Sequence, residues 1–415
     1  MKTVGIEAMN TFCGTAYVNV NELAEYRKLN TARFDNLMMK EKSVTLLHED
    51  PVSLAVNAAK PIIDALSQED KNRIEMVITC TESSFDFGKS MSTYIHDLLG
   101  LNRNSRLFEL KSACNSGVSG LQMAINFILS GVSPEAKVLV LATDISRFIA
   151  VDGGDSLSED WSFSEPSSGA GATAVLVSND PQIFKIDVGA NGYYSYEIMD
   201  TCRPITDSEA GNSDLSLLSY LDCYEQAFEE YKKRVVNIDY KNSFSYLGFH
   251  TPFGGMVKGA HRKLMRKYYR AEAQEIADDF NLRVSPGMVY CQRVGNIMGA
   301  TTMLSLISTI ENGFFDIPKR IGCFSYGSGC SSEFFSGTVS KNGQSKLAEL
   351  SIASRLDQRY KLSMDEYQSI IDSNGLIKFG TRNVKLDMDK IHLDTQEPTL
   401  FLREINEYHR KYEWI

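Results

Sequence analysis

Two short apolar runs constrain the fold of this chain more than any other feature of its sequence. Residues 74–80 (IEMVITC) and 137–143 (KVLVLAT) are nearly continuous apolar stretches rich in β-branched residues. Strands of this kind are buried on both faces, which requires helices on either side of the sheet. Residues 51–66 and 121–129 can supply such helices, because their apolar side chains recur at helical spacing. With a further strand predicted over residues 170–178, the first half alternates strands with helices and predicts an α/β fold.

A cysteine precedes one of these predicted helices. Cys114 is followed by the small residues 116–120 and by an apolar stretch that Gly131 can close in the left-handed conformation. Unpaired N–H groups and the positive end of the helix dipole favour a thiolate at this position. We expect the small neighbours to let a substrate approach the sulfur. A buried cysteine that packs as a small hydrophobe would give the same local pattern, so other residues must decide between the two interpretations.

Length and composition exclude several classes of protein. The chain has 415 residues, enough for one two-lobed domain or two ordinary domains. It has no apolar run of about 18 residues and no secretory leader, so we expect a cytoplasmic protein without a membrane partner. A net charge of −10 argues against nucleic-acid binding. The 8 cysteines are scattered without a C-x-x-C pair, so neither a metal site nor a disulfide framework is expected.

Further candidate residues stand at the ends of predicted elements. Glu82 follows the strand over residues 74–80, and strand ends are where ligands collect in α/β sheets. His250 lies between an apolar run and a Pro/Gly turn, and Asn296 lies near the start of a helix. Residues 320–329 form a strand that runs into a glycine-rich turn, whose N–H groups can hold an oxyanion or a phosphate. Each residue also has an ordinary interpretation, as a loop acid, a structural histidine or a helix cap.

Together these groups suit thioester chemistry. A thiolate can accept an acyl group, and a nearby carboxylate can remove a proton from the carbon next to its carbonyl. Backbone N–H groups can hold the enolate oxygen, while His250 and Asn296 polarise a second carbonyl. The sequence therefore suggests carbon–carbon bond formation by a Claisen-type addition.

One segment is strongly basic although the chain is acidic. Residues 258–270 contain no acid and carry seven basic or imidazole side chains, which are Lys258, His261, Arg262, Lys263, Arg266, Lys267 and Arg270. This pattern predicts a patch for an anionic partner, with a solvated helix face as the alternative.

Five motifs occur in the order seen in 3-hydroxy-3-methylglutaryl-CoA (HMG-CoA) synthases, and the chain resembles that family over nearly its whole length. They are ITCTES around Glu82, ELKSACNSG around Cys114, FHTPFGG around His250, VGNIMG around Asn296 and FSYGSG around Ser328. EPSSGAGATAVL (residues 165–176) matches as well. Five further stretches are more similar still to the synthase-like enzymes of polyketide β-branching cassettes; they are MKEK, EDP, NAAKPIIDAL, ATDISRF and NVKLD. Those enzymes act on carrier-protein thioesters.

The resemblance implies the thiolase-superfamily fold, with two similar α/β halves in five layers (αβαβα), and a homodimer. We expect residues 1–180 to form the N-terminal half. Residues 181–415 would form the C-terminal half, with an elaborated insertion at about 181–245. The site residues divide between the halves, with Glu82 and Cys114 in the first and with His250, Asn296 and Ser328 in the second.

The resemblance also implies a role for each motif residue. Cys114 would be the acetylated nucleophile, and Glu82 the base that makes the acetyl enolate and a proton donor to the new alkoxide. His250, with help from Asn296, would orient and polarise the β-keto acceptor. The N–H groups of Cys114 and Ser328 would form the oxyanion hole. The expected oxyanion-hole and substrate-binding residues are Ser328, Asn296, Ser167 and Tyr326.

Substrates and partners follow from the same resemblance. The substrates would be phosphopantetheine thioesters of carrier proteins, or of CoA, and no tightly bound cofactor is expected. Donor and acceptor acyl carrier proteins would be partners, followed by an enoyl-CoA hydratase-like dehydratase and a decarboxylase that process the product. The residues expected to dock the carriers are Arg33, Lys258, Arg266 and Lys267.

Three positions depart from the family pattern. Asn115 stands where a tyrosine usually follows the nucleophile, and Ser112 stands where a longer polar residue is common. Both changes predict an altered acyl pocket. Gly255 stands where CoA-using members carry a lysine for the CoA phosphates, which favours a carrier protein as the substrate.

Three other functions remain open from the sequence. A ketoacyl synthase III-like condensing enzyme would share the Cys, His and Asn residues but would not need Glu82. An HMG-CoA synthase of the mevalonate pathway would use acetyl-CoA and acetoacetyl-CoA. A non-catalytic carrier-binding scaffold would need none of the three residues Cys114, Glu82 and His250.

Overall fold

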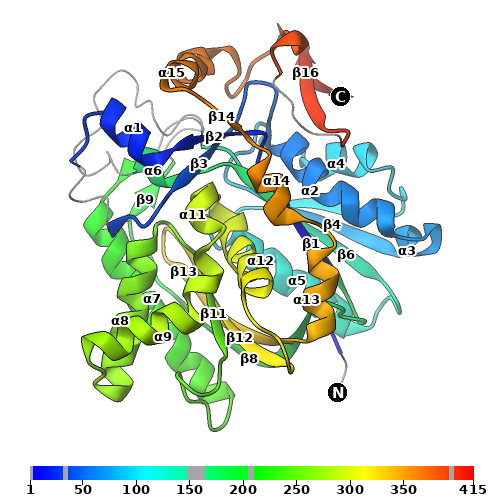
Figure 1. The fold of residues 1–415 in the computed structure, drawn as a ribbon. Helices are drawn as coiled ribbons and strands as arrows, with labels where there is room; N and C mark the ends of the chain where they lie inside the picture. Colours follow the sequence, from blue (N-terminus) through cyan, green and yellow to red (C-terminus); the bar gives the residue numbers. More distant parts are fainter. Residues whose placement is uncertain (1–2, 31–35, 147–163, 204–209, 392–396) are drawn as a thin grey trace.

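A mixed nine-stranded sheet lies at the centre of the fold (Figure 1). The structure is a computed structural model, and it describes residues 3–30, 36–146, 164–203, 210–391 and 397–415. The strand order is β11-β12-β13-β8-β1-β7-β6-β4-β5. Its strands are β1 (Gly5–Phe12), β4 (Ile74–Cys80), β5 (Arg106–Leu110), β6 (Lys137–Asp144), β7 (Gly171–Ser178), β8 (Phe184–Ser195), β11 (Tyr246–Phe249), β12 (Lys319–Gly327) and β13 (Ser331–Val339). Small sheets are formed by β2 (Ala16–Asn19), β3 (Glu41–Val44) and β14 (Tyr360–Lys361), by β9 (Thr201–Cys202) and β10 (Ala210–Gly211), and by β15 (Val384–Lys385), β16 (Leu400–Asn406) and β17 (His409–Trp414).

Helices cover both faces of the main sheet. The α-helices are α1 (Val20–Tyr26), α2 (Pro51–Ala65), α3 (Gln68–Asn72), α4 (Ser92–Leu98), α5 (Ser116–Ser130), α6 (Ser164–Ser167), α7 (Ser213–Arg234), α8 (Gly254–Tyr269), α9 (Ala273–Arg283), α10 (Ser285–Met288), α11 (Cys291–Val294), α12 (Thr301–Asn312), α13 (Lys341–Ala348), α14 (Ile352–Asp357) and α15 (Met364–Asp372). Short 3-10 helices are η2 (Met298–Ala300), η3 (Ser373–Leu376) and η4 (Met388–Lys390). None of the helices in these ranges is long and apolar enough to cross a membrane.

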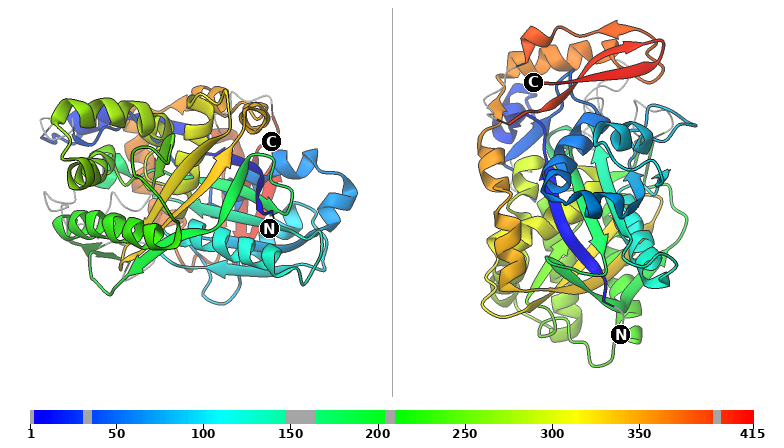
Figure 2. Two further views of the ribbon diagram at one scale, coloured as in Figure 1. Left: turned by 90° about the horizontal axis from the view of Figure 1, so that it is seen from below. Right: turned by 90° about the vertical axis from the view of Figure 1, so that its right-hand side faces the viewer.

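The main sheet consists of two parts joined by a short seam. Strands β1, β7, β6, β4 and β5 form one part, and β11, β12, β13 and β8 form the other. The seam between β1 and β8 is only the pairs Gly5 with Lys185 and Ile6 with Phe184. Helices α5 and α12 lie between the two parts (Figure 1). The right-hand view of Figure 2 shows the C-terminal hairpin, in red, at the opposite end of the molecule from the N-terminus.

Successive residues of each strand pack into different layers, as the pleat requires. In β6, Leu139 and Leu141 pack in the cluster with α2, whereas Val138 and Val140 pack in the cluster with α5. In β12, Cys323 packs in the cluster with α12. The neighbouring side chains Phe324 and Tyr326 join α7 and α8 instead. The fold therefore has five layers. They are, in order, α2 with α4, one part of the sheet, α5 with α12, the other part of the sheet, and α7 with α8. This order confirms the predicted five-layered α/β fold.

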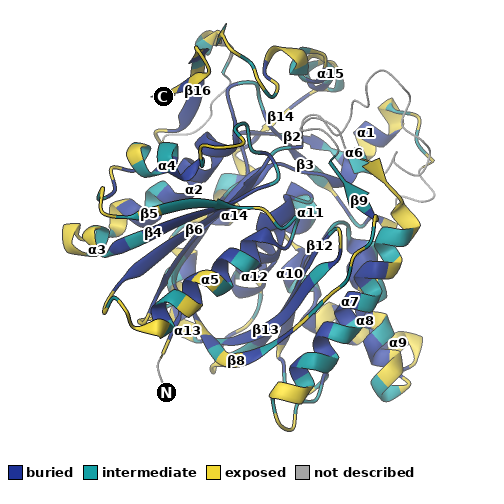
Figure 3. Ribbon diagram, turned by 180° about the vertical axis from the view of Figure 1, so that it is seen from behind, coloured by how far each residue is buried: buried dark blue, intermediate teal, exposed yellow. Residues whose placement is uncertain are grey.

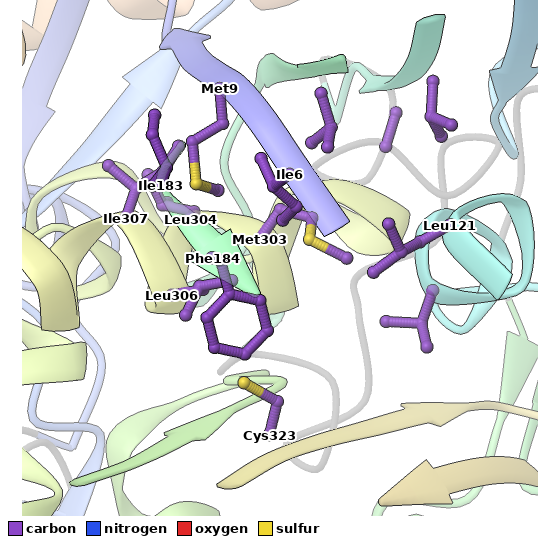
Figure 4. Close-up of a cluster of buried hydrophobic side chains, with 14 of the residues drawn as sticks. Ile6, Met9, Leu121, Ile183, Phe184, Met303, Leu304, Leu306, Ile307 and Cys323 are labelled. Atoms are coloured by element: carbon purple, nitrogen blue, oxygen red, sulfur yellow. The ribbon is translucent and has the colours of Figure 1, made fainter. Parts of the chain in front are cut away.

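Apolar side chains fill the interface between the central helices and β1. Leu121 of α5 lies with Met303, Leu304 and Ile307 of α12, together with side chains of β1 and the start of β8 (Figure 4). Figure 3 shows the same distribution over the whole fold, with buried residues along the strands and central helices and exposed ones on outer turns. Burial on both faces is the reason that these strands have continuous apolar sequences.

The strand expected over residues 74–80 coincides with β4, and Gly131 closes α5 with a φ of 66° as predicted. Residues 181–245, expected to be an elaboration between the halves, contribute β8 to the main sheet and α7 to its covering layer.

Candidate active site

Residues from both parts of the sheet meet at one cavity of about 770 Å³. The predicted residues that line it are Glu82, Cys114, Ser167, His250, Asn296, Tyr326 and Ser328. A larger recess of about 1160 Å³, between α2 and α14, is lined by none of them, so we place the site in the smaller cavity. Within the described ranges, no group of three or more His, Cys, Asp or Glu side chains is arranged to hold a metal ion.

Cys114 lies in the loop between β5 and α5, at the N-terminus of the helix. Ala113 before it has a φ of 44°, a left-handed conformation that costs about 1–3 kcal/mol for a residue with a side chain. The turn is held by Asn115 N–H donating to Ser112 O (3.1 Å) and by Ser116 N–H donating to Ala113 O (3.0 Å). The 15-residue helix α5 therefore directs its positive end toward the half-buried Cys114.

Glu82 is held beside Cys114. The thiol donates to the carboxylate, with Sγ 3.3 Å from Oε1. The two residues come from different loops, but β4 and β5 are neighbouring parallel strands, so both loops leave the same edge of the sheet. Arg203 fixes Glu82 from the other side, donating from Nη1 to its carbonyl oxygen (3.0 Å), while Arg203 Nε lies 3.5 Å from Oε2.

Asp144, at the end of β6, holds the loop of Glu82 by hydrogen bonds. It is fully buried, and its Oδ1 accepts from Glu82 N–H (2.7 Å), Thr81 Oγ1 (3.1 Å) and Ser83 Oγ (2.9 Å). Its Oδ2 has no hydrogen-bond partner among the described residues. Burial and the nearby charge of Glu82 raise the pKa of Asp144 to about 7. A proton on Oδ2 therefore relieves the unpaired charge near neutral pH.

His250 follows β11, next to the strand that leads to the Ser328 turn. Its backbone is fixed at both ends, since its N–H donates to Phe324 O (2.7 Å) and its carbonyl accepts from Tyr220 OH (2.7 Å). Burial lowers the pKa of the imidazole to about 3. The ring is therefore neutral and carries one N–H, and its Nδ1 has no hydrogen-bond partner within the described residues.

Asn296 and Ser167 belong to two segments that pair in the cavity wall. Asn296 N–H donates to Ser167 O, and Gly169 N–H donates to Asn296 O, both at 2.8 Å. The Asn296 side chain does cap the following helical turn, because its Oδ1 accepts from Met298 N–H (3.1 Å) and Thr301 Oγ1 (2.9 Å). Both bonds use the oxygen, so the cap is compatible with a ligand at the amide nitrogen.

Ser328 stands in the turn of the hairpin between β12 and β13. A buried carboxylate that the sequence did not reveal, Asp200, holds this hairpin, accepting from Gly329 N–H (2.7 Å) and from Tyr326 OH (2.5 Å). The Tyr326 hydroxyl also contacts Ser219 Oγ at 2.7 Å. Tyr326 lines the cavity, but its hydroxyl is already hydrogen-bonded to Asp200 and Ser219, which hold the hairpin.

The small residues after Cys114 have a packing role, and their expected role in access to the sulfur stays a prediction. Ser116, Gly117, Val118 and Gly120 are buried, and a Cβ on Gly117 would meet the Gly299 carbonyl oxygen at 2.2 Å. A Cβ on Gly120 would meet Cys80 Sγ at 2.5 Å. Close packing of α5 against its neighbours therefore requires glycine at these two positions.

The departures from the family pattern also have structural settings. Asn115 Nδ2 donates to Ser331 Oγ (3.3 Å), and Ser112 Oγ contacts the same hydroxyl (3.3 Å), so both join the loop of Cys114 to the start of β13. A Cβ on Gly255 would meet the Asn36 carbonyl oxygen at 2.2 Å. A lysine cannot stand at position 255 without moving this backbone.

The predicted basic patch is the surface of α8, outside the cavity lining. Lys267 is paired with Glu225 (2.8 Å) and Glu229 (2.5 Å) of α7. Within α8, the exposed basic side chains that form no ion pair among the described residues are Lys258, Arg262 and Arg266. They recur at every fourth position, which puts them on one face of the helix. Arg270, which follows the helix, is also exposed and forms no ion pair with a described residue. Arg33 lies outside the described residues.

Sequence reasoning missed Arg203 and Asp200, which position Glu82 and the Ser328 hairpin respectively. Both lie in an irregular stretch near β9, without an apolar period or a motif to mark them. Asp144 could have been found from the sequence, because it stands at the end of a predicted buried strand, as Glu82 does, and ligand-binding residues collect at such strand ends.

The cavity combines a thiol paired with a carboxylate and a neutral histidine, and it lies where the two parts of the sheet meet around two central helices. This combination of fold and site defines a thiolase-type condensing enzyme. The chain belongs to the hydroxymethylglutaryl-coenzyme A synthase family, whose N-terminal and C-terminal regions match residues 1–182 and 262–414. The chain is accordingly an acyltransferase that forms carbon–carbon bonds.

Individual relatives cover most or all of the chain. The polyketide biosynthesis 3-hydroxy-3-methylglutaryl-ACP synthase PksG of Bacillus subtilis (strain 168) is 64% identical over 419 residues, covering 100% of both chains. The hydroxymethylglutaryl-CoA synthase of Enterococcus faecalis is 33% identical over 89% of this chain and 91% of its own length. Among solved structures, the HMG synthase of the curacin biosynthetic pathway in complex with holo donor-ACP has a TM-score of 0.95 at 60% identity, covering 100% of both chains.

Proposed function

We propose that this enzyme is a 3-hydroxy-3-methylglutaryl-ACP synthase that installs a β-branch on a carrier-bound polyketide intermediate. The observation that carries the proposal is the Cys114 Sγ to Glu82 Oε1 contact of 3.3 Å in a cavity that His250 and Asn296 also line. The identity to PksG, whose name specifies an ACP substrate, supports carrier proteins over CoA.

In the first step Cys114 takes the acetyl group. Its sulfur attacks the carbonyl carbon of the acetyl-carrier thioester while the thiol proton passes to Glu82, the carboxylate to which it already donates. The C–S bond to the carrier breaks, and Glu82 gives this proton to the departing phosphopantetheine sulfur and is a carboxylate again. The N–H groups of Cys114 and Ser328 hold the oxyanion in this proposal, and the end of α5 adds its dipole.

In the second step Glu82 makes the nucleophile. Its carboxylate removes a proton from the acetyl methyl on Cys114, and the resulting enolate carbon attacks the β-carbonyl carbon of the acceptor. Arg203 keeps Glu82 oriented for this transfer. Neutral His250 donates its single N–H to the acceptor carbonyl, and the Asn296 amide adds a second donor. The new alkoxide takes a proton, which Glu82 supplies.

Water then cleaves the thioester on Cys114. This frees the enzyme and leaves a 3-hydroxy-3-carboxymethyl acyl chain on the acceptor carrier. That tertiary alcohol can lose water and then carbon dioxide, so a dehydratase and a decarboxylase would follow. We also propose a homodimer, as the resemblance implies.

Two observations support carriers over CoA. Position 255 leaves no room for a phosphate-binding lysine, because a Cβ there would lie only 2.2 Å from the Asn36 carbonyl oxygen. Carrier proteins are acidic, and the face of α8 with Lys258, Arg262 and Arg266 offers positive charge without an internal partner among the described residues. Lys267 is already committed to α7, so we restrict the docking proposal to this face.

Intact-protein mass spectrometry tests the proposed function. The enzyme is mixed with acetyl-carrier protein or, separately, with acetyl-CoA, and a Cys114→Ser variant is the control. One acetyl group on the wild type from the carrier, and little from CoA, is the expected result. Rapid acetylation from CoA would indicate an enzyme of the mevalonate-pathway type, and no acetylation from either donor would indicate a scaffold.

Charge reversal tests the docking face. Arg266→Glu should raise the apparent KM for acetyl-carrier about tenfold at low salt, with a smaller effect at high salt. Arg103→Glu, at an exposed arginine between α4 and β5, is the matched control and should leave that KM unchanged. Equal KM values for both variants would contradict docking on α8.

A further inference from the structure

Phe87 is the most exposed large hydrophobic side chain in the described part of the structure, with 89% of its surface accessible to solvent. It lies in the loop after Glu82, and this loop has a defined shape. Asp86 Oδ1 accepts from the N–H groups of Gly88 and Lys89, both at 2.7 Å. Single exposed apolar side chains are common on protein surfaces, so the case for a binding role rests on what lies next to this ring.

A second ring meets Phe87 at the cavity. Phe379, from the segment between η3 and β15, has its ring centroid 4.6 Å from that of Phe87, with the planes at 50°. Both rings line the cavity that contains Cys114 and Glu82. Phe87 lines the cavity and is exposed to solvent, so it stands at the cavity mouth, and the two rings together form an apolar rim there.

The reaction needs two openings for an extended acceptor. The phosphopantetheine arm must enter, and the acyl chain beyond the β-carbon must have a place outside the reaction centre. Phe253 and Met256, at the start of α8, line the cavity on the side of the proposed docking face. Helix α4, which follows the Phe87 loop, lies at the opposite end of the molecule from α8 in two opposed views (Figures 1 and 3).

We propose that Phe87 and Phe379 form a subsite for the acyl chain of the acceptor beyond its β-carbon. The pair would select extended, apolar β-ketoacyl chains over acetoacetyl, because only a longer chain reaches the rim and buries methylene groups against the two rings. This inference rests on the proposed function and names the class of acceptor that the site prefers.

The test measures how well wild type, Phe87→Ala and Phe379→Ala use a short and a long acceptor. Acetoacetyl-carrier and a straight-chain β-ketooctanoyl-carrier are given to the acetylated enzyme, and product is measured by mass spectrometry. Each variant should lower the ratio of kcat/KM for the long over the short acceptor about tenfold, the loss expected for about two buried methylene groups. Phe314→Ala is the matched control, because Phe314 is 68% exposed and does not line the cavity.

An unchanged ratio in both variants would overturn the subsite. So would a Phe87→Ala variant that changes from dimer to monomer on size-exclusion chromatography with light scattering, because a second copy of the chain would then cover the ring. Wild-type enzyme that condenses neither carrier-bound acceptor would refute the proposed function itself, which keeps the two failures distinct.

Discussion

Replacing Asp144 by asparagine should remove a stability change that the wild type shows with pH. The carboxyl is fully buried, its Oδ1 accepts from the Thr81–Ser83 segment, and its Oδ2 has no partner among the described residues. Burial and the charge of Glu82 raise its pKa from 3.8 to about 7. The folded protein therefore holds a proton between these pH values that the unfolded chain has lost.

The sign and size of the effect follow from this difference. Because the folded-state pKa is raised, the wild type loses stability as pH rises from the unfolded value through the folded one, and the loss levels off above about pH 7. At about 1.4 kcal/mol per pH unit below the folded pKa, the change between about pH 5 and about pH 8 is about 3 kcal/mol. The amide of an asparagine at this position cannot ionise, so the variant lacks this contribution.

The assay is urea unfolding of wild type and Asp144→Asn at pH 5, 6, 7 and 8, followed by circular dichroism and intrinsic fluorescence. The free energy of unfolding of the wild type minus that of the variant should fall by about 3 kcal/mol from pH 5 to pH 8, with most of the fall below pH 7. Asp64→Asn, at an exposed carboxylate of α2, is the control and should give a nearly flat difference. A flat difference for Asp144→Asn would refute the argument, whatever the absolute stability of the variant.

Three further outcomes are expected. Glu82→Gln should lower the rate of condensation on the order of a thousandfold while acetyl-enzyme still forms, measured by quenched-flow mass spectrometry; loss of neither step would favour a ketoacyl synthase III-like enzyme. Gly117→Ala should lower the free energy of unfolding by about 3 kcal/mol, because its Cβ would meet Gly299 O at 2.2 Å; Gly259→Ala, whose nearest neighbour is at 3.7 Å, should not destabilise. The ring ¹⁵N shifts of His250 should remain those of neutral imidazole from pH 8 to pH 5, since burial lowers its pKa to about 3; a titration near pH 6.5 would contradict this.

The local pattern of the sequence was sufficient for the elements that build the site. Residues 74–80 form β4 because continuous β-branched apolar residues fit a strand that is covered on both faces. Gly131 ends α5 because only its missing side chain makes the left-handed conformation easy. Motif resemblance then led to the family, which the match over residues 1–182 and 262–414 confirms.

Tertiary contacts decided features that no local pattern carries. Arg203 and Asp200 gain their positions from partners far away in the sequence, so their own neighbours gave no signal. The charge of α8 was visible in its sequence, but Lys267 is neutralised by acids of another helix, α7. Likewise, the apolar rim exists only because the loops of Phe87 and Phe379 converge at one cavity.

The sequence by itself therefore determined the fold class, several strands and helices of the N-terminal half and the residue types available for thioester chemistry, because hydrophobic period and turn chemistry act over a few residues. Only the tertiary structure decided which of those residues share a site and in what state. The Cys114 thiol meets Glu82 because two parallel strands end at one edge of a sheet. The pKa values of Asp144 and His250 are shifted because the folded chain removes both side chains from water.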